Sequence, residues 1–135
     1  MKKLLILCAA LVAGACTADE AQVEADRSRT QATLAAELAD YESSGPPVSC
    51  VSSRDLQGNH SVGDAVVFEG TGGRLWVNSP AGGCPDLGMG RALMVRSTGS
   101  QLCRGDIATV VDMSSRTTYG GCGLGDFQPY RRRPR

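Results

Sequence analysis

Four widely spaced cysteines constrain the fold of this chain more than any other feature of its sequence. They are Cys50, Cys84, Cys103 and Cys122, with no Cys-x-x-Cys pair among them, and the chain has a single histidine, His60. That spacing does not match a structural zinc site, in which ligands come in close pairs. In an exported chain it indicates a disulfide framework, which stabilises a small domain by restricting its unfolded state.

The first residues indicate that the chain is indeed exported. Two lysines precede an apolar run over residues 4–12, and small residues follow at 13–15. This is the layout of a bacterial signal peptide, and the apolar run is too short to span a bilayer as a permanent helix. Residues 1–15 are therefore predicted to be a signal peptide, which removes Cys8 from the mature chain.

Cys16 follows this signal directly, which predicts a lipoprotein that is cut before Cys16 and acylated on its thiol. With Cys16 lipidated, the other four cysteines can form two disulfides and leave no free thiol. Thr17 in the next position, rather than Asp, favours the periplasmic face of the outer membrane. Ala13 stands where lipoprotein signals usually carry Leu or Val, and Ala13-x-Ala15 also suits ordinary signal peptidase. The alternative is therefore a soluble periplasmic or secreted protein.

Charge divides the mature chain into two segments. Residues 17–45 hold seven acids and two arginines, whereas residues 46–135 hold seven acids and ten arginines. We interpret residues 16–47 as a lipid-anchored helical stalk and linker. Residues 48–130 are then a disulfide-stapled β domain, and residues 131–135 are a basic tail.

The first segment is predicted to be helical over Ala18–Glu42, which contains neither Gly nor Pro. Thr17 and Glu20 match a capping box at its start. Three apolar residues share one face of the helix at i, i+4 and i+7 spacing, namely Leu34, Leu38 and Tyr41. One interpretation is a stalk that pairs with a partner helix, and the simpler one is a polar, partly frayed helix.

Short β-branched runs between glycines follow from residue 48 onward and predict strands. The clearest pair is a hairpin of Asp64–Glu69 and Arg74–Asn78 around Gly70–Gly73. Further strands are expected at Val48–Ser53, Arg91–Ser97, Ile107–Asp112 and Cys122–Gln128. Three Gly-Asp dipeptides, at residues 63–64, 105–106 and 125–126, are turn signals.

The predicted fold is therefore mainly β: a small antiparallel β-barrel or curled sheet of about six strands with two disulfides, preceded by a signal peptide and an N-terminal helix. Three pairings of the four cysteines are possible. We favour Cys84–Cys103, because a tie across the base of the strand at Ala92–Arg96 closes a local loop. That choice leaves Cys50–Cys122 to join the first strand of the domain to its last.

Catalytic motifs are not evident, and no catalytic residue, metal ligand or cofactor is assigned. His60 lies in Gly58-Asn59-His60-Ser61, which we interpret as a solvated turn. The alternative is a small hydrolase in which His60 acts as a base beside Asp64, Asp86 or Asp106. The chain lacks the serine-elbow, zinc-protease and phosphate-loop motifs.

Two short arginine-containing segments suggest partners. Arg104-Gly105-Asp106 spells an adhesion tripeptide, but we interpret it as one of the Gly-Asp turns. The chain ends with a cluster of basic residues at Arg131, Arg132, Arg133 and Arg135. In an exported protein such a cluster meets anionic lipid or lipopolysaccharide rather than nucleic acid. A frayed, solvated terminus is the simpler interpretation.

Several cysteine and turn motifs, taken together, resemble those of a known family. They are Cys50-Val51-Ser52, Val67-Phe68-Glu69, Trp76-Val77-Asn78, Cys84-Pro85-x-Leu87, Leu102-Cys103-x-Gly105-Asp106 and Cys122-Gly123-Leu124-Gly125-x-Phe127. Over about Ser49–Tyr130 the chain resembles a family of small exported proteobacterial proteins classified only as a domain of unknown function. The resemblance implies a lipoprotein-type signal, which is common in that family, and it implies no catalytic residue.

The sequence therefore predicts a cell-envelope lipoprotein whose β domain is a non-catalytic binding or structural module. Its expected partners are the membrane, through the lipid anchor, and an envelope protein. The alternatives are an inhibitor of a periplasmic or host hydrolase and, less favoured, a small hydrolase that uses His60.

Overall fold

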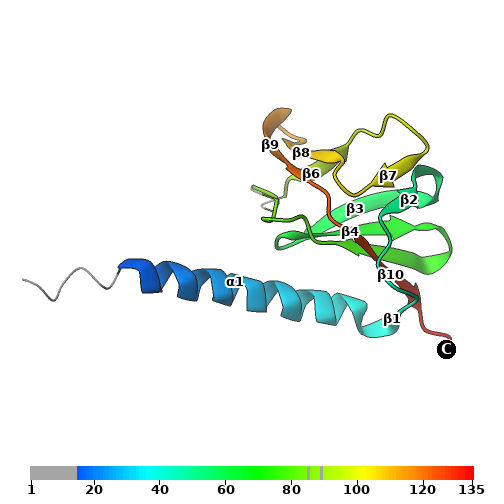
Figure 1. Cartoon of the computed structure of the whole chain (residues 1–135), viewed down its shortest axis with the longest axis horizontal. Coiled ribbons are helices and arrows are strands. Elements are labelled where there is room, and N and C mark those ends of the chain that lie inside the picture. Colours follow the sequence, from blue (N-terminus) through cyan, green and yellow to red (C-terminus); the bar gives the residue numbers. More distant parts are fainter. Residues whose placement is uncertain (1–14, 85, 89) are drawn as a thin grey trace, which may run out of the picture.

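The computed structural model describes residues 15–84, 86–88 and 90–135. Residues 1–14 of the predicted signal peptide lie outside this part. The described chain has one α-helix followed by ten strands, which form three antiparallel sheets (Figure 1). It is mainly β, as predicted, but the strands outnumber the expected set and form no closed barrel in the described residues.

The largest sheet, sheet A, has its strands in the order β1-β10-β5-β4-β3. Their bounds are β1 Tyr41–Ser43, β3 Leu56–Val62, β4 Ala65–Gly70, β5 Arg74–Asn78 and β10 Phe127–Arg132. The predicted hairpin is confirmed as β4 and β5, in which Val67 lies opposite Val77. Four successive residues of β4, 65–68, are buried, because other elements cover both faces of sheet A.

Two smaller sheets complete the β domain. Sheet B pairs β2 (Cys50–Ser52) with β7 (Gln101–Cys103), and sheet C has the order β6-β8-β9. The strands of sheet C are β6 Ala92–Val95, β8 Ile107–Asp112 and β9 Thr117–Gly123. Short 3-10 turns lie at Leu38–Asp40, Ser53–Asp55 and Thr71–Gly73.

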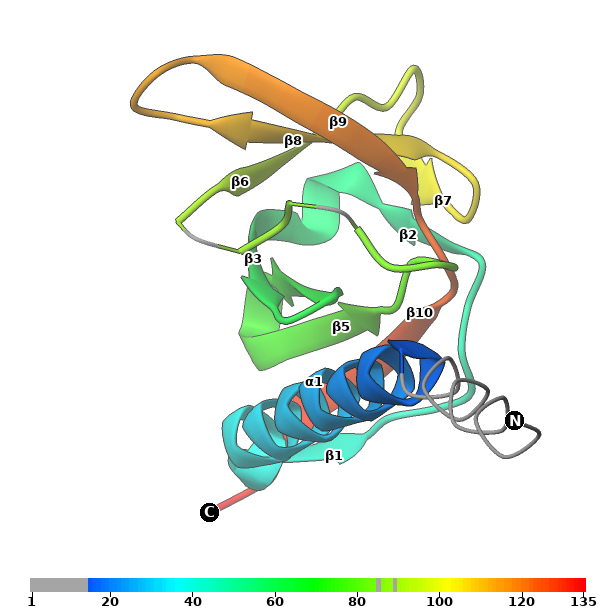
Figure 2. The ribbon, with the colours of Figure 1, turned by 90° about the vertical axis from the view of Figure 1, so that its left-hand side faces the viewer.

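The elements stack in three layers, with α1 (Ala15–Glu37) against one face of sheet A and sheet C across the other (Figure 2). The main core lies between the two sheets, where the rings of Phe68 and Phe127 are 5.6 Å apart at their centroids. A smaller core lies between sheet A and the helix, around Val67 and Leu75. Burial of these side chains holds the layers together through the hydrophobic effect.

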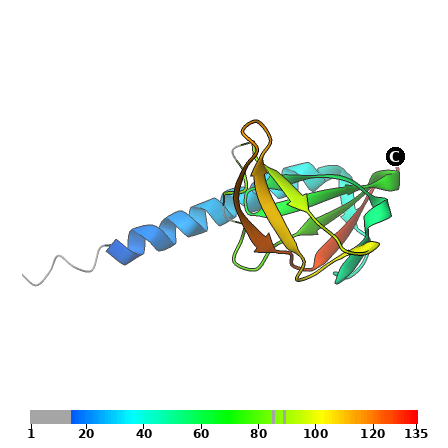
Figure 3. The same cartoon turned by 90° about the horizontal axis from the view of Figure 1, so that it is seen from above.

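The three predicted apolar residues pack together, but only Leu34 lies in α1, and the predicted bounds of the helix are wrong. Leu34, Leu38 and Tyr41 all pack against the smaller core. In the described residues α1 already includes Ala15, so Thr17 lies inside the helix and the predicted capping position is wrong. Its regular part ends at Glu37, because Tyr41 already pairs with β10 as part of β1. The N-terminal half of α1 projects past the β domain (Figure 3).

The disulfides join Cys50 to Cys103 and Cys84 to Cys122, so the predicted pairs Cys50–Cys122 and Cys84–Cys103 are wrong. Cys50 and Cys103 are direct partners in the pairing of β2 with β7, and their Cα atoms are 4.0 Å apart. Cys84 follows β5 and reaches Cys122 on β9. The two bonds therefore interleave along the chain instead of one enclosing the other.

Several predicted boundaries also differ. Residues 58–61, interpreted as a turn, belong to strand β3, where Asn59 and His60 pair with β4. The predicted strand Cys122–Gln128 is wrong, since it covers the end of β9, a bend and the start of β10. Sheet A takes in residues 41–43 and 131–132, so the β structure extends beyond the expected domain 48–130 at both ends.

Candidate functional site

Sheet C and its β8–β9 turn carry the largest group of exposed apolar side chains in the described structure. Six large apolar side chains are exposed in the whole described structure, and four of them belong to sheet C or its hairpin turn. These four are Met94, Ile107, Met113 and Tyr119. Single exposed apolar residues are ordinary on a soluble protein, but a cluster marks an interaction surface.

The strand register explains why Met94 and Ile107 face outward. Met94 on β6 lies opposite Thr109 on β8, and Ile107 lies opposite Gly123 on β9. The residues between them, such as Ala108 and Val110, point inward and are fully buried in the main core. Successive residues of β8 are thus apolar on both faces, although only one face is covered.

An open groove of about 630 Å³ runs over this face toward the β8–β9 turn. Two methionines contribute to it, with Met94 42% and Met113 65% exposed. Methionine side chains are flexible and polarizable, and they adapt to the shape of a bound partner. The lining residues are Met94, Arg96, Thr109, Val111, Asp112, Met113, Arg116 and Thr118. We call this surface the sheet C groove.

The acid in the sheet C groove is already engaged by its own turn. The Asp112 carboxylate accepts hydrogen bonds from the Ser114 hydroxyl at 2.6 Å and from the backbone N–H groups of Ser114 and Ser115 at 2.8 and 3.1 Å. These bonds, that from the Ser114 hydroxyl above all, hold the pKa of Asp112 below its ordinary value. The turn at one end of the groove is therefore fixed by side-chain contacts.

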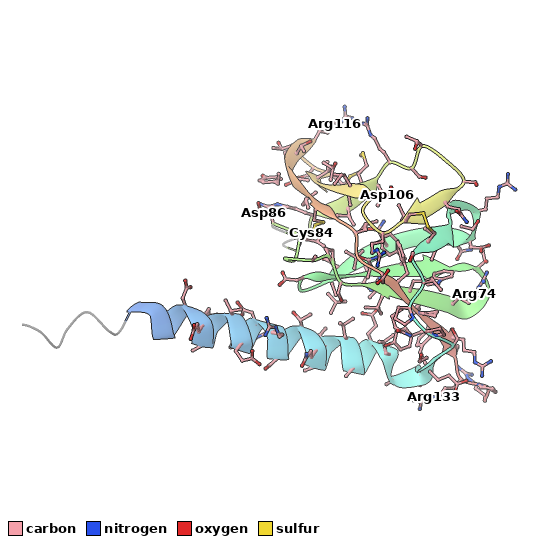
Figure 4. All side chains as sticks on the ribbon, in the orientation of Figure 1. Arg74, Cys84, Asp86, Asp106, Arg116 and Arg133 are labelled. Carbon is pink, nitrogen blue, oxygen red and sulfur yellow. A yellow bond between two sulfur atoms is a disulfide. The ribbon has the colours of Figure 1, made fainter. Side chains whose placement is uncertain are left out.

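The arginines of the groove give it a positive character. Neither Arg96 nor Arg116 forms an ion pair with a carboxylate in the described residues. Arg91 lies nearby with its guanidinium 3.7 Å from the centroid of the Tyr119 ring. Arg116 lies at the end of the molecule farthest from α1 (Figure 4). The groove thus combines apolar side chains with available cations.

His60 has two partners that the sequence did not indicate. Its Nε2 atom lies 2.6 Å from Glu37 of α1, and its Nδ1 atom lies 3.1 Å from Glu69 of β4. Both ring nitrogens therefore face a glutamate carboxylate. The contact ties the end of the helix to sheet A.

The three aspartates proposed as partners of His60 lie elsewhere. Asp64 is in the β3–β4 turn beside Gly83. Asp86 pairs with Arg91 at 3.3 Å. The Asp106 carboxylate accepts the backbone N–H of Cys103 at 2.8 Å, and Figure 4 shows it well apart from Asp86. The structure does not assemble these aspartates with His60, so the geometry gives no support to the hydrolase alternative.

The adhesion tripeptide is held within the domain. Gly105 has a φ of +89°, which fits the predicted turn into β8. Arg104 pairs with Asp126 at 3.3 Å, while Asp106 caps the same turn. Both charged ends of the tripeptide thus have partners in the domain.

The basic tail is partly built into sheet A. Arg131 pairs with Glu42 at 2.8 Å, and Arg132 donates a hydrogen bond to the Tyr41 hydroxyl at 3.2 Å. That bond raises the pKa of the Arg132 guanidinium further above its ordinary value. The backbone N–H of Arg133 bonds to Asp40. The remaining arginine, Arg135, is exposed at the opposite end of α1 from Cys16.

Cys16 lies in the first turn of α1. The helix continues without a break from this residue to Glu37, and no flexible segment separates Cys16 from the sheet that the helix covers. In the described part of the chain, no helix is both long and apolar enough to cross a membrane. The same residues contain no group of three or more His, Cys, Asp or Glu arranged to hold a metal ion.

Sequence reasoning missed the sheet C groove, although one signal was present. Residues 107–111 read Ile-Ala-Thr-Val-Val, with apolar residues at both even and odd positions. A strand of this kind is usually buried on both faces. Here no element of the described chain covers the second face, and that mismatch is what marks the site.

Comparison with known proteins adds no relative: no family model matches the chain, and no curated protein or solved structure is significantly similar to it. The fold and the surface define a small disulfide-bonded β domain on a helical arm, with one exposed apolar and basic sheet face.

Proposed function

We propose that this chain is a cell-envelope lipoprotein, anchored through Cys16, whose β domain binds an envelope protein through the sheet C groove. The observation that carries the proposal is the pair of exposed methionines, Met94 and Met113, in the sheet C groove, beside two arginines that form no ion pair in the described residues. Apolar anchors flanked by arginine are typical of protein–protein interfaces.

The charge of the groove indicates the chemistry of the partner. Asp112 is engaged by its turn, whereas Arg96 and Arg116 are available. A partner surface that carries apolar side chains beside carboxylates complements this arrangement, because its charges would meet cations at the edge of an apolar contact. We favour binding over catalysis, since the structure does not assemble His60 with Asp64, Asp86 or Asp106.

The arm supports the tethering part of the proposal. A helix of 23 residues spans about 34 Å, so acylation at Cys16 would hold the β domain within that distance of the membrane surface. Sheet C lies on the side of the domain away from α1 (Figure 2), so a partner can reach the groove along it. The two disulfides suit an oxidising compartment. We also propose that the chain belongs to the family of small exported proteobacterial proteins that its sequence resembles.

The test is photo-crosslinking in the native host with a photoreactive residue in place of Met94 or Met113. We expect each position to give the same discrete crosslinked protein, and an exposed control position outside sheet C, Ser100, to give none. No product from either methionine position, or equal products from all three positions, would contradict the proposal. Identification of the crosslinked protein also tests the inhibitor alternative, because a hydrolase would then be the partner.

A further inference from the structure

Strand β9 forms a long open edge of sheet C. It pairs with β8 on one side and has no strand on its other side in the described structure. The opposite edge of the sheet, β6, lies against β3, where Asn59 donates a hydrogen bond to the Leu93 carbonyl. Among the other edge strands, β1, β2 and β7 are only three residues long, and β3, which has seven residues like β9, is the strand that lies against β6.

The open edge of β9 lacks the charges and prolines that usually protect an edge strand. Residues 117–123 contain no charged residue and no proline, and five of them in succession, 117–121, are exposed. The single irregularity is a bulge that leaves Tyr119 without a direct partner on β8. Alternate residues of such a strand turn backbone N–H and C=O groups outward, where another strand can bond to them.

The glycines of β9 make the neighbouring apolar side chains reachable from this edge. Gly121 lies opposite Thr109, and Gly123 lies opposite Ile107, which is 64% exposed. No side chain on β9 therefore separates Ile107 from a strand added beside β9.

The fold needs only one of these two glycines. A Cβ on Gly121 would lie 2.8 Å from the Ala108 carbonyl oxygen, so the packing of β9 on β8 excludes a side chain there. A Cβ on Gly123 would meet no atom within 4 Å, and its φ lies outside the left-handed region. Glycine inside a strand weakens it and often marks the close approach of another backbone.

Resting on the proposed function, we infer that the partner binds by adding an extended segment to β9 as a fourth strand of sheet C. Backbone hydrogen bonds along β9 supply affinity, and alternate side chains of the segment select it. An apolar side chain of the segment reaches across Gly123, where β9 has no side chain, and packs on Ile107. A carboxylate at one end of the segment pairs with Arg116, whose charge the described structure leaves open.

The test uses the full chain in detergent and short fluorescent peptides in which valine alternates with threonine, with one glutamate at either end. We expect fluorescence anisotropy to show binding. Methylation of the peptide's backbone nitrogens at every second residue should weaken binding about thirtyfold when it falls on one set of alternate residues. It should leave binding unchanged when it falls on the other set. Gly123→Val, which fills the space over Ile107, should weaken it about tenfold without lowering the melting temperature. The matched control is Gly99→Val, another glycine with no atom within 4 Å of a built Cβ, in the loop before β7.

The outcomes separate strand addition from the proposed function. Peptide binding that tolerates methylation of either set of alternate residues but is lost in Met94→Asp would overturn strand addition and leave the groove as a binding site. A dimer that Gly123→Val dissociates, seen by analytical ultracentrifugation, would assign the edge to a second copy of this chain and overturn the inference. Failure of every peptide would also overturn it, while the crosslinks from Met94 would still decide the proposed function.

Discussion

Asn78 shows how one buried polar residue fixes the path of the chain. Its side chain is fully buried at the end of β5 and bonds both backbone groups of Gly125. The Nδ2 atom donates to the Gly125 carbonyl at 2.8 Å, and the Oδ1 atom accepts the Gly125 N–H at 2.9 Å. A Cβ on Gly125 would collide with the Ser79 carbonyl, so glycine and asparagine are both required where the chain turns into β10.

Asn78→Ala should therefore lower the free energy of unfolding by about 2–3 kcal/mol, because it leaves a buried N–H and a buried C=O without partners. The measurement is chemical denaturation of the parent and the variant. Asn59→Ala is the control. Asn59 makes a single hydrogen bond of 3.4 Å to Leu93, so its loss should lower the free energy of unfolding clearly less. Equal losses in the two variants would contradict the role given to Asn78.

At the scale of elements, the local parts of the fold were predictable and the distant pairings were not. The β4–β5 hairpin was predicted correctly because both strands and their turn lie within residues 64–78. Strand β3 was missed because residues 58–61 favour turns. Asn59 and His60 instead find partners on β6, α1 and β4, which no local pattern reveals. Tertiary contacts of this kind override local propensity.

Strand β10 was misplaced for a related reason. Pro129 suggests the end of a strand, since proline cannot donate a hydrogen bond to a neighbour. Pro129 pairs with Trp76 of β5 on one side. On its other side, β1 ends opposite Tyr130, so Pro129 has no partner residue in β1. Its carbonyl accepts the N–H of Ser44. The proline is tolerated because of where β1 ends, and the sequence of β10 does not contain that information.

The β8–β9 turn should respond to pH through Asp112. Its folded pKa is lowered by the bonds from Ser114 and Ser115, so its contribution to stability is complete above the unfolded pKa and is lost as pH falls through the folded pKa. We expect Asp112→Asn to melt below the parent at pH 7 and the difference to shrink below about pH 4. A difference in melting temperature that stays constant from pH 7 to acid would contradict this account.

Docking of α1 should depend on the residues of its C-terminal half. Leu34→Asp places a charge against the smaller core around Val67 and Leu75, so it should release the helix from sheet A and raise amide hydrogen exchange along α1. Val23→Asp is the matched control, because Val23 is 55% exposed on the projecting half. Equal exchange in the two variants would show that the helix is not held by this face.

The whole molecule is held by two interleaved disulfides that the sequence predicted in number but not in partner. They enclose separations of 53 and 38 residues, and chain entropy gives each a stabilisation of about 4 kcal/mol. Choosing a local loop across the base of the strand at Ala92–Arg96 led to Cys84–Cys103, whereas Cys103 lies on β7 and faces Cys50 across sheet B. Likewise, the sheet C groove depends on which face of β8 stays uncovered, and only the assembled layers decide that.

The central claim is that the β domain is carried on an arm anchored at Cys16, and mass spectrometry of the mature N-terminal peptide tests it most directly. The account predicts that the protein recovered from the membrane fraction begins at Cys16, with a diacylglyceryl group on its sulfur. Cys16→Ala should be found in the soluble fraction without lipid. A mature chain that begins at another residue, or that carries a free thiol at Cys16, would contradict the account.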